Sequence, residues 1–358
     1  MHLPHPSSLL PPKFTHCQPR PDVRNILITG GAGFIGSWLA YMFASVYPDS
    51  YKIIIFDNLE YCASTKNLAF LAEYKDSASF VKGDIACEEQ VFSCLKTHKI
   101  DTIFHLAAQT HVDASFTDPY AFTRANVLGT QTLLEACSKV GTVKRFYHMS
   151  TDEVYGELMP FARNHVESDP LAPTNPYSAT KAAAEMLVQA YAKTYKLQTV
   201  ILRPNNIFGP CQYPEKIIPK FLMLLKHGQK MTLHRGSGLY SRCYLYVTDA
   251  ANAMNIIFHR GEEGGIYNIS SRDEITNARV CESLFSLVGR QRDGCVWDWI
   301  QDVPGRLSHD RAYGVDSSRL ESLGWKQEVE FDKGLGATAS WYMRFGEDWW
   351  TGLGAKDI

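Results

Sequence analysis

The feature that most constrains the fold is a glycine-rich turn between a strand pattern and a helical pattern. Residues 25–29 form a short apolar run, Gly30, Gly33 and Gly36 follow at intervals of three, and a helical pattern covers residues 37–46. Glycine permits a tight turn and a close approach of the backbone to a pyrophosphate, and the helix N-terminus attracts the phosphate charge. The spacing therefore predicts a strand–turn–helix unit that binds a dinucleotide.

The same alternation of apolar strands and helices continues along the chain. Further strands are predicted at 53–56, 79–82, 102–106, 145–150 and 198–203, and helices at 120–138 and 177–195. Continuous apolar strands that alternate with helices are typical of a parallel sheet covered on both faces. We therefore predict an α/β fold, a Rossmann-like doubly wound parallel sheet with a smaller C-terminal α/β substrate domain.

Changes in this pattern suggest the domain boundaries. Residues 1–22, rich in proline, histidine and serine, are expected to be a disordered tail. Residues 23–205 are expected to form the dinucleotide-binding domain, with residues 243–261 returning to it. Residues 206–242 and 262–350 are expected to form the substrate domain. Its elements are predicted at 217–227, 266–269, after Asn277 and at 331–344, and a short strand at 243–247 leads back to the first domain.

The composition excludes several classes of partner. A formal net charge of −2 shows no basic excess, so nucleic acid and anionic membrane surfaces are not expected partners. The nine cysteines are scattered without a Cys-x-x-Cys pair, which indicates reduced thiols and no metal site. No apolar run reaches the roughly 20 residues of a membrane span. The sequence thus predicts a soluble cytoplasmic protein.

Two clusters of polar residues indicate the chemistry. Tyr177 and Lys181 are four residues apart and lie on one helix face, so the ammonium can lower the pKa of the phenol and make it a base. Asp152 and Glu153 follow the strand at 145–150, and elimination of water needs such an acid and base. Asp152 must then have a pKa above about 3.9, through burial or the neighbouring charge. Without the rest of the pattern, the pair could simply favour a helix N-terminus.

A carboxylate after the second strand selects the cofactor. Asp57 stands where a carboxylate accepts hydrogen bonds from an adenosine ribose and repels a 2′-phosphate, which predicts NAD rather than NADP. The alternative is a simple turn residue. Other cofactor contacts are expected in the glycine-rich turn and at the carboxyl ends of strands. These residues are Phe34, Ile35, Asn58, Asp84, Ile85, Leu106, Ala107 and Ala108, together with Tyr177 and Lys181.

Several motifs carry a family resemblance. The glycine spacing with Tyr177-x-x-x-Lys181 resembles the extended short-chain dehydrogenase/reductase superfamily. Within it, the chain is similar to the nucleoside-diphosphate-glucose 4,6-dehydratases over a span from about residue 25 to residue 325. The matching segments are AAQTHVD at 107–113, STDEVYG at 150–156, NPYSATK at 175–181, NNIFGP at 205–210 and YPEKIIP at 213–219.

The resemblance implies an NAD-dependent hydro-lyase of deoxysugar biosynthesis, such as that of rhamnose. UDP-glucose or dTDP-glucose is oxidised at C4, loses water across C5 and C6, and is reduced at C6 to the 4-keto-6-deoxyglucose. Tyr177 takes the proton of the 4-hydroxyl, and Thr151 hydrogen-bonds the same oxygen. Glu153 takes the C5 proton, and protonated Asp152 donates to the departing 6-hydroxyl. The sequence leaves the choice between uracil and thymine open, although eukaryote-like features favour UDP-glucose.

The resemblance also implies the substrate contacts and the assembly. The residues implied to bind the nucleotide sugar are Thr110, Thr151, Asn206, Lys216, Arg242, Arg306 and His309. The chain departs from the family pattern at Asn58, where many members have lysine, and at Cys243 after Arg242, where Asp or Asn is usual. A homodimer is implied through a four-helix bundle of the helices at 120–138 and 177–195.

Two alternatives remain. A nucleotide-sugar 4-epimerase or decarboxylase shares this fold, but such relatives typically carry small or hydroxyl residues at the positions of Asp152 and Glu153. An NAD-binding regulatory module without turnover would have a damaged catalytic set, whereas Thr151, Tyr177 and Lys181 are all present. The carboxylate pair therefore favours the dehydratase.

Overall fold

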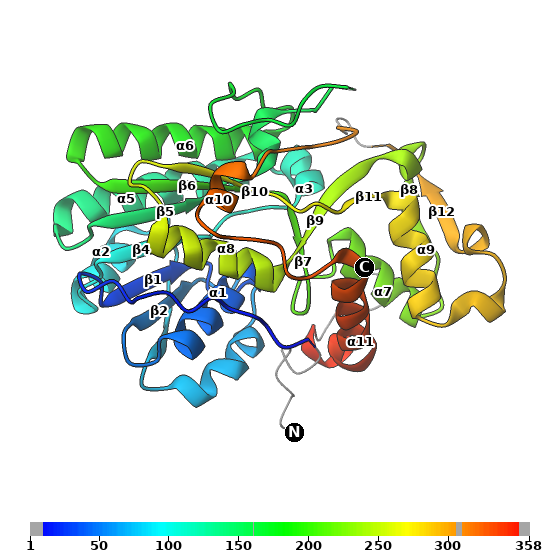
Figure 1. The fold of residues 1–358 in the computed structure, drawn as a ribbon, viewed down its shortest axis with the longest axis horizontal. Coiled ribbons are helices and arrows are strands. Elements are labelled where there is room, and N and C mark those ends of the chain that lie inside the picture. Colours follow the sequence, from blue (N-terminus) through cyan, green and yellow to red (C-terminus); the bar gives the residue numbers. More distant parts are fainter. Residues whose placement is uncertain (1–9, 160, 306–309, 351–358) are drawn as a thin grey trace.

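A seven-stranded parallel sheet forms the centre of the first lobe of the computed structural model, which describes residues 10–159, 161–305 and 310–350 (Figure 1). The strands lie in the order β10-β6-β5-β4-β1-β2-β3. Their bounds are β1 Asn25–Thr29, β2 Lys52–Asp57, β3 Ala78–Lys82, β4 Thr102–His105, β5 Arg145–Met149, β6 Gln198–Pro204 and β10 Ile266–Ile269. The order reverses between β1 and β4, which is where open α/β sheets bind their ligands.

Helices cover both faces of this sheet, as the alternation of strands and helices predicts. One face carries α1 (Phe34–Val46) and α8 (Val247–Arg260); the other carries α2 (Glu88–Thr97), α5 (Gly129–Val140) and α6 (Pro176–Tyr195) (Figure 1). Side chains alternate along each strand, so Ile26 and Ile28 join the core beneath α1 and α8. Leu27 joins the core beneath the other three helices. The predicted doubly wound fold is confirmed.

The helix predicted at 120–138 is composite. It begins as α4 (Pro119–Phe122), widens into a π-helical segment at Thr123–Leu128 and continues as α5. Asp118 caps the first turn by accepting a hydrogen bond from the Ala121 amide. A π-helical segment inside an α-helix is often found at a functional site. Here it brings Asn126 against the backbone of Gln109, just beyond β4.

The second lobe is built from two small sheets and three long helices. β7 (Asn206–Phe208), β9 (Ser241–Tyr246) and β11 (Glu274–Thr276) form one sheet, and β8 (Met231–His234) pairs with β12 (Ile300–Val303) in the other. The helices are α7 (Ile217–Lys226), α9 (Asn277–Leu287) and α11 (Phe331–Trp349). Figure 1 shows this lobe beside the carboxyl end of the large sheet. Short α-helices lie at α3 (Val112–Thr117) and α10 (Ser318–Ser322).

The division between the lobes differs from the expected one in two elements. The strand at 266–269, expected in the substrate domain, is β10, the edge strand of the large sheet, where it pairs with β6. The strand expected at 243–247 is β9 of the small sheet, and it is α8 that returns to the first lobe and packs on α1. Both elements are too short for their partners to be recognised from the local pattern, because pairing depends on distant strands.

The described part of the expected tail is packed. Residues 10–22 run along α1 and α8, where the Thr15 amide donates to Asn252 Oδ1 at 2.8 Å and the Cys17 amide donates to the Tyr47 hydroxyl at 2.9 Å. Cys17 is buried. Polar side chains on both helices therefore satisfy the backbone of this segment, and residues 1–9 lie outside the described part. Among the described helices, none has the length and apolar character needed to cross a bilayer.

Candidate active site

The glycine-rich turn after β1 leaves space that a side chain would fill. Gly30 has a φ of +67°, and a Cβ there would lie 2.7 Å from the Ala107 amide nitrogen. A Cβ at Gly36 would collide with the Gly30 carbonyl oxygen, so the turn can close tightly against α1. A Cβ at Gly33, which precedes α1, would lie 3.2 Å from the Gly30 carbonyl oxygen. The turn thus fits the pyrophosphate of a dinucleotide.

Asp57 supports this turn from the end of β2. Its carboxylate accepts hydrogen bonds from the amides of Ala32 (3.0 Å) and Leu59 (2.8 Å), and the side chain is only 6% exposed. Burial raises the pKa of Asp57, whereas these backbone hydrogen bonds lower it. Asp57 therefore stabilises the turn through these hydrogen bonds and also lines the pocket beside it. Its expected contact with a ribose stays a prediction.

One pocket of about 290 Å³ brings together every residue expected to contact the cofactor. Its lining includes Gly30, Gly33, Phe34, Ile35, Gly36, Asp57, Asn58, Asp84, Ile85, Leu106, Ala107, Ala108, Tyr177 and Lys181. Arg124 was not among the predicted residues but also lines this pocket, and its guanidinium lies 2.7 Å from Asp84 Oδ2. No local signal marks this contact, because the two residues are forty positions apart.

Asp152, which follows β5, and Asn205, which follows β6, form a buried pair. Asp152 lies in the 3₁₀ turn Asp152–Tyr155 and is 3% exposed, and Asn205 Nδ2 donates to Asp152 Oδ2 at 2.6 Å. Burial first, and then the charge of Glu153, raise the pKa of Asp152 to about 7. A carboxyl group with this pKa can hold a proton near neutral pH. The capping role in this turn belongs to Thr151, whose hydroxyl accepts from the Glu153 amide at 3.3 Å.

Glu153 lies nearby in a different environment. Asn175 Nδ2 donates to Glu153 Oε2 at 3.1 Å, and the same asparagine caps α6 by accepting from the Ser178 amide. Burial raises the pKa of Glu153, whereas Asn175 and the positive charges of Arg242 and Lys216 lower it. Glu153 also lines both pockets of the site, so it can reach a ligand in either.

Tyr177 and Lys181 lie in the first turns of α6 and are 8% and 3% exposed. Burial, followed by the charge of Glu153, raises the pKa of Tyr177, and a hydrogen bond with Thr151 lowers it. Burial also lowers the pKa of Lys181 to about 8. Burial therefore dominates the direction of the Tyr177 pKa, and the expected lowering of this pKa by Lys181 stays a prediction.

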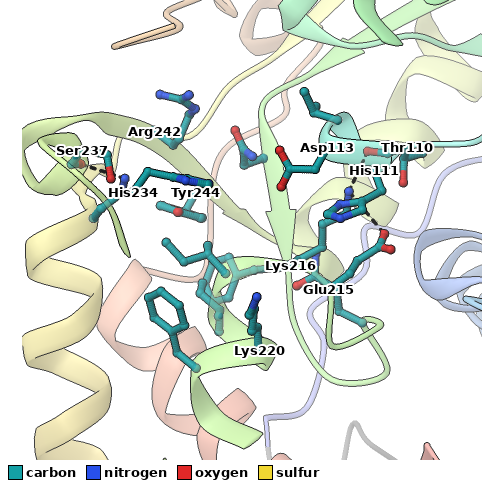
Figure 2. A pocket seen from close by; sticks show the side chains of 18 of the residues that line it. Thr110, His111, Asp113, Glu215, Lys216, Lys220, His234, Ser237, Arg242 and Tyr244 are labelled. Carbon is teal, nitrogen blue, oxygen red and sulfur yellow. Dashed lines mark hydrogen bonds and ion pairs between the residues drawn. The ribbon is translucent and has the colours of Figure 1, made fainter. Parts of the chain in front are cut away.

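A second pocket of about 470 Å³ lies between the lobes (Figure 2). Figure 2 shows Arg242, Tyr244 and His234 on one side of it and Thr110, Asp113 and Lys216 on the other. The two pockets share a boundary. The shared lining residues are Thr110, Glu153, Asn206, Ile207, Gln212, Tyr213, Glu215 and Lys216. Two ligands, one bound in each pocket, would therefore meet beside Glu153.

Most of the expected substrate residues in the described chain lie at this boundary or in the second pocket, whereas Thr151 lines the first pocket alone. Lys216 Nζ donates to the Thr110 carbonyl oxygen at 2.7 Å, which ties the two lobes together. Arg242 donates to the Asp310 carbonyl oxygen at 2.9 Å and lies 4.6 Å above the Tyr313 ring, so Cys243 is not needed to orient it. Arg306 and His309 lie outside the described residues.

Asn175 and Asn205, whose side-chain amides hydrogen-bond the two carboxylates, were not among the predicted site residues. Asn175 precedes Pro176, and an asparagine before a proline is a common start of a helix, but its second contact with Glu153 needs the tertiary structure. Asn205 stands beside Asn206, and only the latter was expected to act. Neither amide could be assigned to a carboxylate from spacing alone.

Known proteins resemble the chain over most of its length. The family model described as GDP-mannose 4,6 dehydratase matches residues 27–338. A trifunctional UDP-glucose 4,6-dehydratase/UDP-4-keto-6-deoxy-D-glucose 3,5-epimerase/UDP-4-keto-L-rhamnose-reductase of Arabidopsis thaliana is 45% identical over 331 residues, 91% of this chain and 48% of that protein. The chain thus spans about half the length of such relatives. The dTDP-D-glucose 4,6-dehydratase of Homo sapiens is 40% identical over 91% of this chain and 92% of its own length.

Solved structures show the same likeness. A crystal structure of a dTDP-glucose 4,6-dehydratase from Streptomyces venezuelae with NAD bound has a TM-score of 0.85 at 36% identity, and covers 92% of this chain and 100% of that chain. A UDP-glucose 4-epimerase of Thermus thermophilus in complex with NAD has a TM-score of 0.80 at 28% identity, and covers 89% of this chain and 99% of that chain.

Proposed function

The chain belongs to the GDP-mannose 4,6-dehydratase family, and from this premise we propose that it is an NAD-dependent hydro-lyase acting on a nucleoside-diphosphate glucose. It converts UDP-glucose or dTDP-glucose to the nucleoside-diphosphate 4-keto-6-deoxyglucose. The observation that carries the proposal is the pair of buried Asp152 and partly buried Glu153 beside Tyr177, next to the boundary of the two pockets. A 4-epimerase has no step that needs a carboxyl group with a pKa of about 7.

The first pocket fits NAD. The turn at Gly30, Gly33 and Gly36 receives the pyrophosphate, and Asp57 at the ribose end disfavours the 2′-phosphate of NADP. When bound, NAD supplies reversible two-electron redox chemistry to the sugar carbons. The likeness to solved structures that contain NAD supports this choice of cofactor.

The buried side chains divide the proton transfers among them. Tyr177 takes the proton of the 4-hydroxyl as C4 is oxidised, and Thr151 hydrogen-bonds the same oxygen. Lys181, with a pKa of about 8, is cationic at neutral pH and stabilises the phenolate that forms. The C4 ketone makes the C5 proton acidic, so Glu153 removes it while Asp152 protonates the departing 6-hydroxyl. Glu153 returns its proton to C5 as C6 is reduced.

Cationic and amide groups hold the nucleotide in the second pocket. Lys216, Arg242 and Asn206 bind the diphosphate, and Thr110 contacts the sugar. Arg306 and His309 complete the set by the family resemblance. Relatives that are named for UDP-glucose and for dTDP-glucose support both nucleotides as substrates. Comparing kcat/KM for the two substrates decides which base is preferred.

A homodimer is part of the proposal. Four exposed residues lie along one face of α6: Ala179, Ala183, Met186 and Ala190. Residues at this spacing form a continuous stripe, and three alanines permit close approach of a partner helix. The neighbouring Leu128 is 48% exposed and extends the apolar surface. We place the enzyme in the cytoplasm, since all nine cysteines are free thiols.

The decisive experiment is a direct assay. Purified protein is incubated with UDP-glucose and, separately, with dTDP-glucose, and alkali is then added to develop the chromophore of a 4-keto-6-deoxy sugar. The chromophore is expected with at least one of the two. Its absence with both, in protein that binds NAD, would remove the dehydratase proposal. Appearance of the galactose nucleotide instead would favour the epimerase.

A further inference from the structure

We propose that Asn205 is a positioning residue that fixes the acid proton of Asp152 on Oδ1, an inference that rests on the proposed dehydratase function. Asn205 follows β6 and is 4% exposed. Its backbone amide donates to the Ile269 carbonyl oxygen of β10 at 3.0 Å. The main chain of the large sheet therefore anchors the residue directly beside the catalytic carboxyl group.

The hydrogen bonds of Asn205 determine the orientation of its side chain. The Ser271 backbone amide, which can only donate, lies 3.3 Å from Oδ1 of Asn205. The other end of the side chain must then be the NH2 group, and this Nδ2 lies 2.6 Å from Asp152 Oδ2. An amide NH2 cannot accept a hydrogen bond, so Oδ2 of Asp152 must be an acceptor. The carbonyl oxygen of a protonated carboxyl group is a stronger acceptor than its hydroxyl oxygen, so this contact favours a proton on Oδ1.

Oδ1 of Asp152 faces the hydroxyl group of Thr151. Thr151 Oγ1 donates to Asp152 Oδ1 at 3.2 Å when Asp152 is ionised. Because a hydroxyl group can both donate and accept, a protonated Oδ1 can instead donate to Oγ1 across the same contact. Thr151 is also hydrogen-bonded to Tyr177. During elimination the O–H bond at Oδ1 and the C6–O bond break, and water leaves. The electron pair of the C5–H bond forms the C5–C6 double bond, while its proton goes to Glu153. Asp152 becomes a carboxylate whose Oδ2 keeps the hydrogen bond from Asn205.

Charged and titratable groups surround Asp152 on several sides. Glu153 lies next in the chain, Tyr177 faces it from α6, and Arg242 and Cys243 face it from β9. The Asn205 hydrogen bond favours the ionised form of Asp152 and so lowers its pKa. Removing this donor should raise the pKa. The acid would then stay protonated to higher pH, but the proton would no longer be confined to Oδ1.

The test uses two substrates that differ only in the leaving group. One is the nucleotide sugar with its 6-hydroxyl, which needs a proton from Asp152 to depart. The other is its 6-deoxy-6-fluoro analogue, from which fluoride leaves without that proton. With the hydroxyl substrate, Asn205→Ala should lower kcat by about 10- to 100-fold, because the acid is misplaced. With the fluoro analogue, the loss should be within about 3-fold, since no general acid is required.

Two further readouts separate positioning from structure. Asn205→Ala should still oxidise C4, so the absorbance of reduced nicotinamide should accumulate with the hydroxyl substrate. In this variant, the fall in kcat that accompanies deprotonation of Asp152 should move to higher pH. A loss of stability alone does not produce such a shift. Asn268→Ala is the matched control, because Asn268 is fully buried and hydrogen-bonds Tyr155 and His165 without touching Asp152. This control should leave unchanged both the ratio of the kcat values for the two substrates and the pH at which kcat falls.

Clear outcomes would overturn the inference. An equal loss with both substrates would indicate a structural role for Asn205, and turnover close to that of the wild type would show that it has none. A selective loss of kcat with the hydroxyl substrate in Asn268→Ala would also refute the inference, because this control does not remove the donor to Asp152. If Asn205→Ala does not fold, Asn205→Leu keeps most of the volume, lacks the donor and is judged by the same criteria. Failure of the wild-type protein with both natural substrates would instead overturn the proposed function.

Discussion

At the scale of single residues, the site separates two adjacent carboxylates by their surroundings. Asp152 is buried against Asn205 and has a pKa of about 7, whereas Glu153 opens on both pockets near Lys216 and Arg242. One group can therefore hold a proton while its neighbour can take one. Such a division of environments is how one site provides an acid and a base at the same pH.

Replacement of the base should separate the steps of the reaction. Glu153→Gln is expected to oxidise C4 but to lower elimination by about 10²- to 10⁴-fold, because a carboxamide cannot accept the C5 proton. Absorbance of reduced nicotinamide should then build up during a single turnover. Tyr177→Phe serves as the comparison and should block the first step, so that no such absorbance forms. Full turnover by Glu153→Gln would contradict the assignment.

The pKa of Asp152 leads to a pH dependence with a definite sign. The acid must be protonated to act, so kcat should fall as the pH rises through about 7. Lys181, with a pKa of about 8, should cause a second loss at higher pH as its ammonium deprotonates. Profiles measured with the hydroxyl substrate and the 6-fluoro analogue distinguish the two groups. With fluoride as the leaving group, the fall in kcat near pH 7 should vanish. If this fall persisted, the assignment of Asp152 as the acid would be contradicted.

At the scale of elements, α6 connects two residues of the candidate site, Tyr177 and Lys181, to the large sheet. Asn175 begins the helix, Tyr177 and Lys181 follow, and one turn later Glu185 is completely buried. Glu185 Oε2 lies 2.6 Å from Arg203 Nη2 on β6. The ion pair joins the helix that carries Tyr177 to the strand that precedes Asn205, so it holds both residues in one rigid unit.

Breaking this pair should strongly destabilise the fold. Arg203→Met leaves the Glu185 charge buried without its hydrogen-bonded partner, and the free energy of unfolding should fall by about 3–5 kcal/mol. Urea unfolding measures the change. The matched control is Arg279→Met, since Arg279 and its partner Asp332 are 52% and 69% exposed and such pairs contribute about 0–1 kcal/mol. Equal effects of the two substitutions would disprove the role of the buried pair.

At the scale of the whole molecule, the two lobes meet along the line between the pockets. Lys216 of the second lobe donates to the backbone of Thr110 in the first, and Tyr61 donates to Glu215 at 2.7 Å. The sugar of a bound nucleotide would lie at this junction, next to the carboxyl ends of the parallel strands. The outer surface of α6 faces away from it and is available for a second subunit.

The proposed dimer can be disrupted without touching the site. Met186 is 50% exposed on α6, and Met186→Arg should yield a monomer in sedimentation at micromolar concentration, because like charges would face each other across a symmetric interface. Leu239→Arg is the control, since Leu239 is 86% exposed but lies in the second lobe. This variant should remain dimeric. A monomeric wild-type protein would refute the proposed assembly.

The amino-acid sequence alone predicted the doubly wound sheet, the glycine-rich turn and the residues of the candidate site, because each depends on short-range spacing. Gly30, Gly33 and Gly36 need only one turn, and Tyr177 and Lys181 need only one helix face. Tertiary structure decided what depends on distant partners, such as the pairing of β10 with β6 and the amide of Asn205 on Asp152. It also decided the pKa values of Asp152 and Tyr177, since burial is a property of the folded chain and spacing does not encode it.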